Sequence, residues 1–287
     1  MVKLANEDIK TREVLEWKGL HVFHFSFSSC SQKLRIFLNL KGVEWVPHPI
    51  DLMANEHLTD HFLGINPRGL VPVLVHDGDV HIESNDILTY LESVFPEPRL
   101  IPAGLEYKVA ELLKHEDDLH LDLRALSFRF VFNPPHNPKS PEDLKVYATA
   151  GSGTVMGEAD QHIGVEIDFW ERIASEGITD QAAKSAVAKF RDAFTHLDNT
   201  LAGQDYLLAE GFSVLDIAWF ISVNRLILTG YPIGRLHSKL GAWYDRLAKM
   251  PEIAKEVALP PRVKEKFDAT RAQHLAEGVH LEAVVGL

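Results

Sequence analysis

The chain is 287 residues long and acidic, with 29 Lys and Arg residues against 41 Asp and Glu residues and a formal net charge of -12. That balance, without a basic stripe of interleaved aromatic residues, argues against a nucleic-acid partner, and no uninterrupted apolar run approaches the length that spans a bilayer. The length predicts two ordinary domains. A single cysteine excludes an internal disulfide bond and the polar start carries no apolar leader, so we expect the protein to be in a reducing cytoplasm.

The first hundred residues carry alternating strand and helix signals. Residues 1–18 are polar and are interpreted as an N-terminal extension. Period-two alternation then predicts strands, helical spacing of apolar residues predicts helices, and glycine and proline mark their ends. The expected order is strand, helix, strand, strand, strand, helix, over residues 20–25, 34–41, 44–50, 71–75, 80–82 and 85–95. We therefore predict an α/β domain over residues 19–102.

Strand signals disappear after residue 107, and helical patterns replace them. The stretch 96–104, which contains proline and glycine, is the expected linker. An all-helical domain is predicted over 107–259 and a C-terminal tail over 260–287. Its expected helices span 107–131, 142–149, 158–175, 181–202, 214–229 and 236–249.

Small hydroxyl residues gather at the start of the first predicted helix. Ser28 or Ser29 stands where an N-cap belongs. A hydroxyl at this place either caps the helix or, aided by the helix dipole, stabilises a thiolate that a ligand brings in. Cys30 is the rival nucleophile, although a cysteine inside a helix more often has a structural role.

Pro72 opens the third apolar strand, where it donates no hydrogen bond to the ladder. Either it begins an edge strand or the Val71–Pro72 bond is cis. A cis bond would turn the backbone of Val71 toward solvent, where it can pair with an extended peptide.

Glu83 and Ser84 join the fourth strand to the next helix. One interpretation is a cap, with Ser84 capping and the acid favouring the helix dipole. The other is a binding site, in which Glu83 pairs with an ammonium group while Ser84 and its backbone hold a carboxylate.

Two further patterns are interpreted as structural. Ser213 and Asp216 form a capping-box pattern before an apolar helix. His115 and His120 are five residues apart and so face different sides of a helix, from which we expect no metal site.

Together these motifs resemble the cytosolic glutathione transferase superfamily, serine type, over residues 20 to 250. The likeness rests on the serine loop, on the segment Asn-Pro-Arg-Gly-Leu-Val-Pro at 66–72 and on the Glu-Ser pair. It implies a thioredoxin-like glutathione-binding domain followed by an all-α domain, with glutathione as the cofactor. It also implies a hydroxyl catalyst at Ser28 or Ser29, with Cys30 secondary, and glutathione contacts from Val71, Pro72, Glu83 and Ser84.

The region from residue 66 to 97 is most similar to bacterial lignin β-etherases of this superfamily. That likeness implies that the glutathione thiolate attacks a small hydrophobic aromatic electrophile and releases a phenol. The alternatives are a zeta-like glutathione-dependent isomerase, a Cys30-dependent dehalogenase or thiol transferase, and a non-enzymatic binding protein of the same fold. The resemblance further implies a dimer, homodimeric or heterodimeric, and the tail at 260–287 either covers the cleft or is loosely attached.

Overall fold

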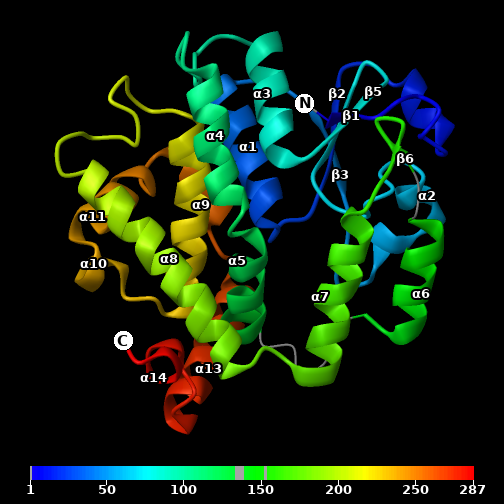
Figure 1. Ribbon diagram of the computed structural model, residues 1–287. Helices are drawn as coiled ribbons and strands as arrows, with labels where there is room; N and C mark the ends of the chain where they lie inside the picture. Colours follow the sequence, from blue (N-terminus) through cyan, green and yellow to red (C-terminus); the bar gives the residue numbers. More distant parts are fainter. Residues whose placement is uncertain (1, 133–138, 152–153) are drawn as a thin grey trace. The chain divides into compact units, whose positions relative to one another are not determined.

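The computed structural model describes residues 2–132, 139–151 and 154–287, and the chain divides into two compact units (Figure 1). The first unit, Met1–Pro98 with His136–Gly177, is built around a five-stranded sheet of order β1-β5-β4-β2-β3. Strands β2 and β3 are parallel and the other neighbours are antiparallel. The strands are β1 Val2–Lys3, β2 Leu20–His24, β3 Val46–Pro49, β4 Val73–His76 and β5 Asp79–Ile82.

Helices and a small hairpin complete the first unit. Helix α1 ends at Gly42, which has φ +64° and caps it as expected of glycine. Helix α3 packs against α1 and β5. The elements are η1 Arg12–Glu16, α1 Ser29–Lys41, η2 Glu56–Leu58, α2 Asp60–Leu63, α3 Ser84–Val94, α6 Pro141–Ala150, β6 Thr154–Val155, β7 Glu158–Ala159 and α7 His162–Glu176.

The stretch from α6 to α7 belongs to the sheet unit, whereas the sequence analysis assigned it to the helical domain 107–259. Tyr147 and Ile163 are buried in one cluster with Leu58 and Leu63. Val155 joins the apolar core beneath the sheet. Helices α6 and α7 pack against each other (Figure 1). The apolar faces of this stretch are therefore buried by the α/β domain.

Residues 1–18 also belong to the domain rather than extending from it. Strand β1 pairs with β5, matching Val2 with Ile82. Ile9 and Val14 are buried in the core next to the sheet. A two-residue strand is too short to show an alternating pattern, so periodicity does not predict a strand there.

The second unit, Arg99–Pro135 with Ile178–Leu287, is helical in its described part. Its centre is α9, which is buried nearly all round and begins with the predicted capping box of Ser213 and Asp216. The elements are α4 Glu106–Asp117, α5 His120–Ser127, the π-helical turn η3 Phe128–Phe132, α8 Asp180–Thr200, α9 Val214–Thr229, α10 Ile233–Leu236, α11 Ser238–Leu247, α12 Pro251–Val257, α13 Pro261–Glu277 and α14 Leu281–Val285.

Two helical expectations differ from the structure. The stretch 107–131, expected as one helix, is divided into α4, α5 and η3. The stretch 260–287, expected as a tail, forms α13 and α14, which pack on η3 and α8. Leu281 is 1% exposed, and Arg235 forms an ion pair with Glu282. The C-terminal segment is thus packed within its unit.

Two kinds of feature are absent from the described residues. None of the helices in this part of the chain combines the length and the apolar character that a bilayer crossing requires. No group of three or more His, Cys, Asp or Glu side chains there is arranged to hold a metal ion.

A buried ion pair joins α1 to α3. Lys41 places Nζ 2.6 Å from Oε2 of Glu92 and donates to the carbonyl oxygen of Pro98, also at 2.6 Å. The side chain of Lys41 is fully buried and that of Glu92 is 9% exposed. When one partner of a buried ion pair is removed, the remaining charge is destabilised, because it is neither paired nor solvated by water.

We expect Lys41→Met to lower the free energy of unfolding by about 3–5 kcal/mol, since it leaves the Glu92 charge without its cation. The double variant Lys41→Met/Glu92→Leu should regain most of that loss. Urea unfolding followed by tryptophan fluorescence measures both. The matched control is Lys264→Met, because the Lys264–Asp268 pair is exposed and its loss should cost at most about 1 kcal/mol. Equal effects of Lys41→Met and Lys264→Met would contradict the account.

Candidate functional site

The three motifs found in the sequence meet at one end of the sheet. Phe23 of β2 lies opposite Val73 of β4, and Leu74 of β4 lies opposite His81 of β5. Since both pairings are antiparallel, β2 and β5 end where β4 begins. The serine loop, the Val71–Pro72 bond and the Glu83–Ser84 pair are therefore neighbours at that end.

Ser28 is the N-cap of α1. Its Oγ accepts a hydrogen bond from the backbone N–H of Ser31 at 3.2 Å. The hydroxyl therefore uses an oxygen lone pair for the cap and keeps its proton for another acceptor. Ser29 and Cys30 are the first two residues of the helix, and all three side chains are half-buried.

Arg35 shapes the loop that precedes these serines. Its guanidinium donates to the carbonyl oxygens of Phe25 at 3.3 Å and Ser26 at 3.1 Å. From the same helix, Oγ of Ser31 accepts from the backbone N–H of Phe25 at 3.4 Å. Helix α1 thus fixes the loop that leads to its own N-cap.

The Val71–Pro72 peptide bond is cis. Strand β4 has neighbours on both sides, so the edge-strand interpretation of Pro72 is wrong. Asn66, which is 1% exposed, closes the preceding turn: its Nδ2 donates to the carbonyl oxygen of Leu70 at 2.9 Å, and its Oδ1 accepts from the N–H of Arg68 at 3.0 Å.

Glycine is required in the same turn. Gly69 has φ +58°, and a Cβ there would lie 3.1 Å from Cε2 of Tyr147. The hydroxyl of Tyr147 in turn donates to the carbonyl oxygen of Arg68. Helix α6 therefore packs directly on the turn that presents Val71.

Glu83 adopts an uncommon backbone conformation, with φ 64° and ψ 112°. It occupies the N-cap position of α3, but its side chain makes no capping hydrogen bond. Ser84, expected as the cap, is instead the first helical residue and is buried at 6% exposure. The carboxylate of Glu83 is therefore directed to other partners.

Lys33 links the starts of α1 and α3. Its side chain is 2% exposed, and its Nζ donates to Oδ1 of Asn85 at 3.0 Å. Asn85 directly follows Ser84, so this bond ties the helix that carries the serine loop to the helix that carries the Glu-Ser pair.

Arg68 is a charged residue at this end of the sheet that the sequence analysis missed. Its Nη1 lies 2.6 Å from Oε1 of Glu83, and Nε and Nη2 contact the two carboxylate oxygens of Asp160 at 2.8 and 2.9 Å. Burial lowers the pKa of Arg68, but the hydrogen bonds to Asp160 and Glu83 outweigh it and raise that pKa above its ordinary value. No signal in the sequence connects Arg68 with a residue 92 positions away.

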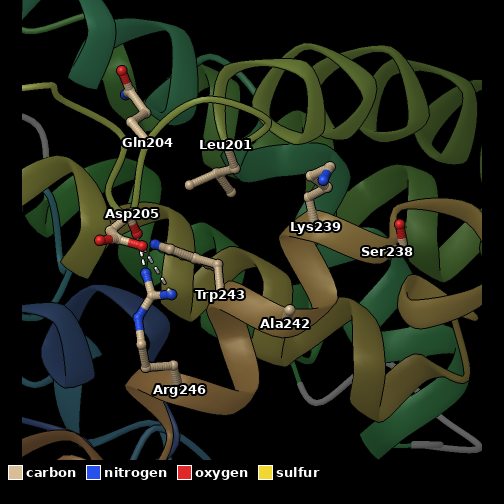
Figure 2. A pocket seen from close by; sticks show the side chains of 8 residues that line it. All are labelled: Leu201, Gln204, Asp205, Ser238, Lys239, Ala242, Trp243 and Arg246. Atoms are coloured by element: carbon tan, nitrogen blue, oxygen red, sulfur yellow. Dashed lines mark hydrogen bonds and ion pairs between the residues drawn. The ribbon is translucent and has the colours of Figure 1, made fainter.

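A surface pocket in the helical unit holds none of the predicted site residues (Figure 2). Its volume is about 220 Å³, and Arg246 forms an ion pair with Asp205 at its wall. Lys239 and Gln204 lie at the same opening, and no cysteine or histidine lines it. We therefore keep the sheet end as the candidate site.

Two family models each match a separate segment of the chain. The family model described as glutathione S-transferase, N-terminal domain, matches residues 27–94, and the one for the C-terminal domain matches residues 176–246. The chain belongs to the glutathione S-transferase family. The predicted fold class, a thioredoxin-like α/β domain followed by an all-α domain, is confirmed. The N-terminal match spans every predicted site residue, and the stretch from α6 to most of α7 lies outside both matches.

The similarity of this transferase to one bacterial protein extends over most of the chain. Protein LigF of Sphingobium sp. is 29% identical over 273 residues, which cover 89% of this chain and 96% of that protein. The crystal structure of the beta-etherase LigF from strain SYK-6 has a TM-score of 0.67 at 28% identity and covers 83% of this chain and 98% of its own.

Plant relatives share a shorter region. A zeta-class glutathione S-transferase of Euphorbia esula is 44% identical over 114 residues, 38% of this chain. Glutathione S-transferase 1 of Dianthus caryophyllus is 45% identical over 91 residues, 32% of this chain. The matches span 51% and 41% of the lengths of these two proteins.

We expect Asn66→Ala to destabilise this transferase by about 1–3 kcal/mol, because the carbonyl of Leu70 and the N–H of Arg68 lose their buried partner. Asn199→Ala, at an exposed position of α8, is the matched control and should change stability by less than about 0.5 kcal/mol. Thermal and urea unfolding measure both. A neutral Asn66→Ala would mean that the turn before Val71 does not depend on this side chain.

Proposed function

We propose that this protein is a glutathione transferase that binds glutathione at the end of the sheet where β4 begins. The backbone of Val71, before the cis bond to Pro72, pairs with the cysteinyl part of glutathione as an added strand would. Glu83 takes the ammonium and Ser84 the carboxylate of the γ-glutamyl end, at the N-terminus of α3. The observation that carries this proposal is the convergence of the three motifs, which the strand register produces.

The hydroxyl of Ser28 stabilises the glutathione thiolate. Its oxygen already accepts from the N–H of Ser31, so its proton is directed to a different acceptor. The first N–H groups of a helix and its dipole add favourable charge for an anion at the same place. Ser29 is the second candidate, and Cys30 has a structural or secondary role.

The electrophile is a small hydrophobic aromatic compound, and cleavage of a β-aryl ether is the reaction that the similarity to the beta-etherase LigF favours. The thiolate attacks the carbon beside an aryl ketone, a carbon–sulfur bond forms, and the carbon–oxygen bond breaks with its electrons leaving on the phenolate. The products are a glutathione thioether and, after protonation, a phenol. The protein has to keep glutathione ionised and aligned with that carbon.

Two accompanying features belong to the same proposal. The active form is a dimer, as is usual in the family, and the identity of its second subunit is open to test by mass measurement. The reaction takes place in the cytoplasm, where reduced glutathione is the abundant thiol and where the chain's single cysteine stays reduced.

The test is incubation of the purified protein with glutathione and a β-aryl ether ketone, with omission of glutathione as the control. Mass spectrometry should detect phenol and thioether in equal amounts. Ser28→Ala should lower turnover about a hundredfold, since one positioned donor to the developing charge is lost. Ser28→Thr, which keeps the hydroxyl, should retain much of the activity, and Ser29→Ala and Cys30→Ala serve as neighbouring controls.

The other outcomes separate the alternatives. Glutathione binding without turnover of the ether would contradict the etherase proposal and leave a transferase or isomerase with another substrate. Conversion of a substrate without consumption of glutathione would indicate the zeta-like isomerase, a possibility that the zeta-class match supports. Loss of activity in Cys30→Ala alone would indicate a thiol transferase or dehalogenase.

A further inference from the structure

We propose that Arg68 and Asp160 are positioning residues for Glu83, so that the segment from α6 to α7 forms part of the recognition site for the ammonium group of the ligand. This inference rests on the proposed function, because it takes Glu83 as the group that meets the γ-glutamyl ammonium.

Asp160 and Glu83 both bind the guanidinium of Arg68. Asp160 holds one edge of the guanidinium with two hydrogen bonds, of 2.8 and 2.9 Å. This bidentate contact fixes the plane of the guanidinium as well as its position. Nη1 then meets Oε1 of Glu83 at 2.6 Å. The orientation of Glu83 is therefore set through Arg68 by Asp160.

The three side chains of Arg68, Asp160 and Glu83 carry a net negative charge. Two carboxylates surround one guanidinium, which leaves the group with one negative charge. The side chains are 7% exposed at Asp160, 15% at Arg68 and 33% at Glu83. The excess charge is therefore most accessible at Glu83. An ammonium group bound to Glu83 neutralises the net charge of the three side chains. Because Arg68 occupies Oε1, the ammonium binds at Oε2.

The segment from α6 to α7 is attached to the rest of its unit through several side-chain contacts. Asp160 lies between β7 and α7, and Arg68 lies in the turn before Val71. Two more contacts attach this segment to the unit: Tyr147 donates to the carbonyl oxygen of Arg68, and Thr154 donates to Asp8 in the N-terminal stretch. The segment thus holds both the backbone and the side chain of Arg68.

The backbone of Glu83 distinguishes this arrangement from an ordinary surface ion pair. A positive φ is rare for a glutamate, and such conformations concentrate where a side chain must point in a fixed direction for function. The exposed ion pair between Asp168 and Arg172, which lies within helix α7, lacks this feature.

The experiment compares glutathione with its analogue that lacks the α-amino group, by calorimetric titration of the full-length protein. In the wild type the ratio of the two affinities reports the ammonium contact. We expect Asp160→Asn to weaken glutathione binding about tenfold and to change binding of the analogue less than about twofold, because only glutathione carries the ammonium group that contacts Glu83. Asp168→Asn, the same change at an exposed position of α7, should alter neither affinity.

Arg68→Gln separates positioning from simple charge. If Arg68 only competed with the ammonium for Glu83, its removal would strengthen glutathione binding; if it orients Glu83, binding weakens about tenfold. We expect weakening, with little further loss in Arg68→Gln/Asp160→Asn. Arg68→Lys keeps the charge without the bidentate contact, and it should weaken glutathione binding with little loss of thermal stability.

Two results would overturn the inference. If Glu83→Gln abolishes the preference for glutathione over its analogue but Asp160→Asn and Arg68→Gln keep the wild-type ratio, Arg68 and Asp160 do not position Glu83, and the proposed function stands. If the wild type itself shows no preference, or Glu83→Gln keeps it, the assignment of Glu83 fails and the inference fails with it.

Discussion

The position of β4 between two antiparallel neighbours is the constraint on which the candidate site depends. Backbone pairing with β2 and β5 fixes where the serine loop and the Glu-Ser pair stand relative to Val71. A shift of either pairing by one residue would move every buried side chain of that strand to the other face, so the core holds the register. The loops can therefore contain polar side chains and uncommon backbone conformations, because the strands hold the loops next to one another.

Polar contacts from α1 add the second level of organisation. Lys41 anchors its last turn to α3, Lys33 reaches the start of α3, and Arg35 holds the loop before Ser28. These side chains are buried, and each finds its partner on a neighbouring element rather than in solvent. Groups held in this way need little reorganisation when a ligand anion arrives, which is the property that electrostatic stabilisation of a thiolate requires.

Local signals in the sequence were sufficient to place the serine loop, Val71 and the Glu-Ser pair at the ends of strands and helices, and insufficient to predict what surrounds them. The serines, Val71 and Glu83 stand beside strand and helix ends that periodicity and capping chemistry reveal. The contact between Arg68 and Asp160 could not be predicted, because the two residues are far apart in the sequence. An apolar helix face shows that the helix is buried but does not show which domain buries it. For the same reason the segment from α6 to α7 was assigned to the helical domain.

A crystal structure with an S-alkyl glutathione would show whether one end of the sheet binds the whole of glutathione. We expect the sulfur beside the hydroxyl of Ser28, main-chain hydrogen bonds from the cysteinyl residue to Val71, and the γ-glutamyl ammonium at Glu83. A ligand bound in the pocket beside Arg246, or with its γ-glutamyl end away from Glu83 and Ser84, would contradict it.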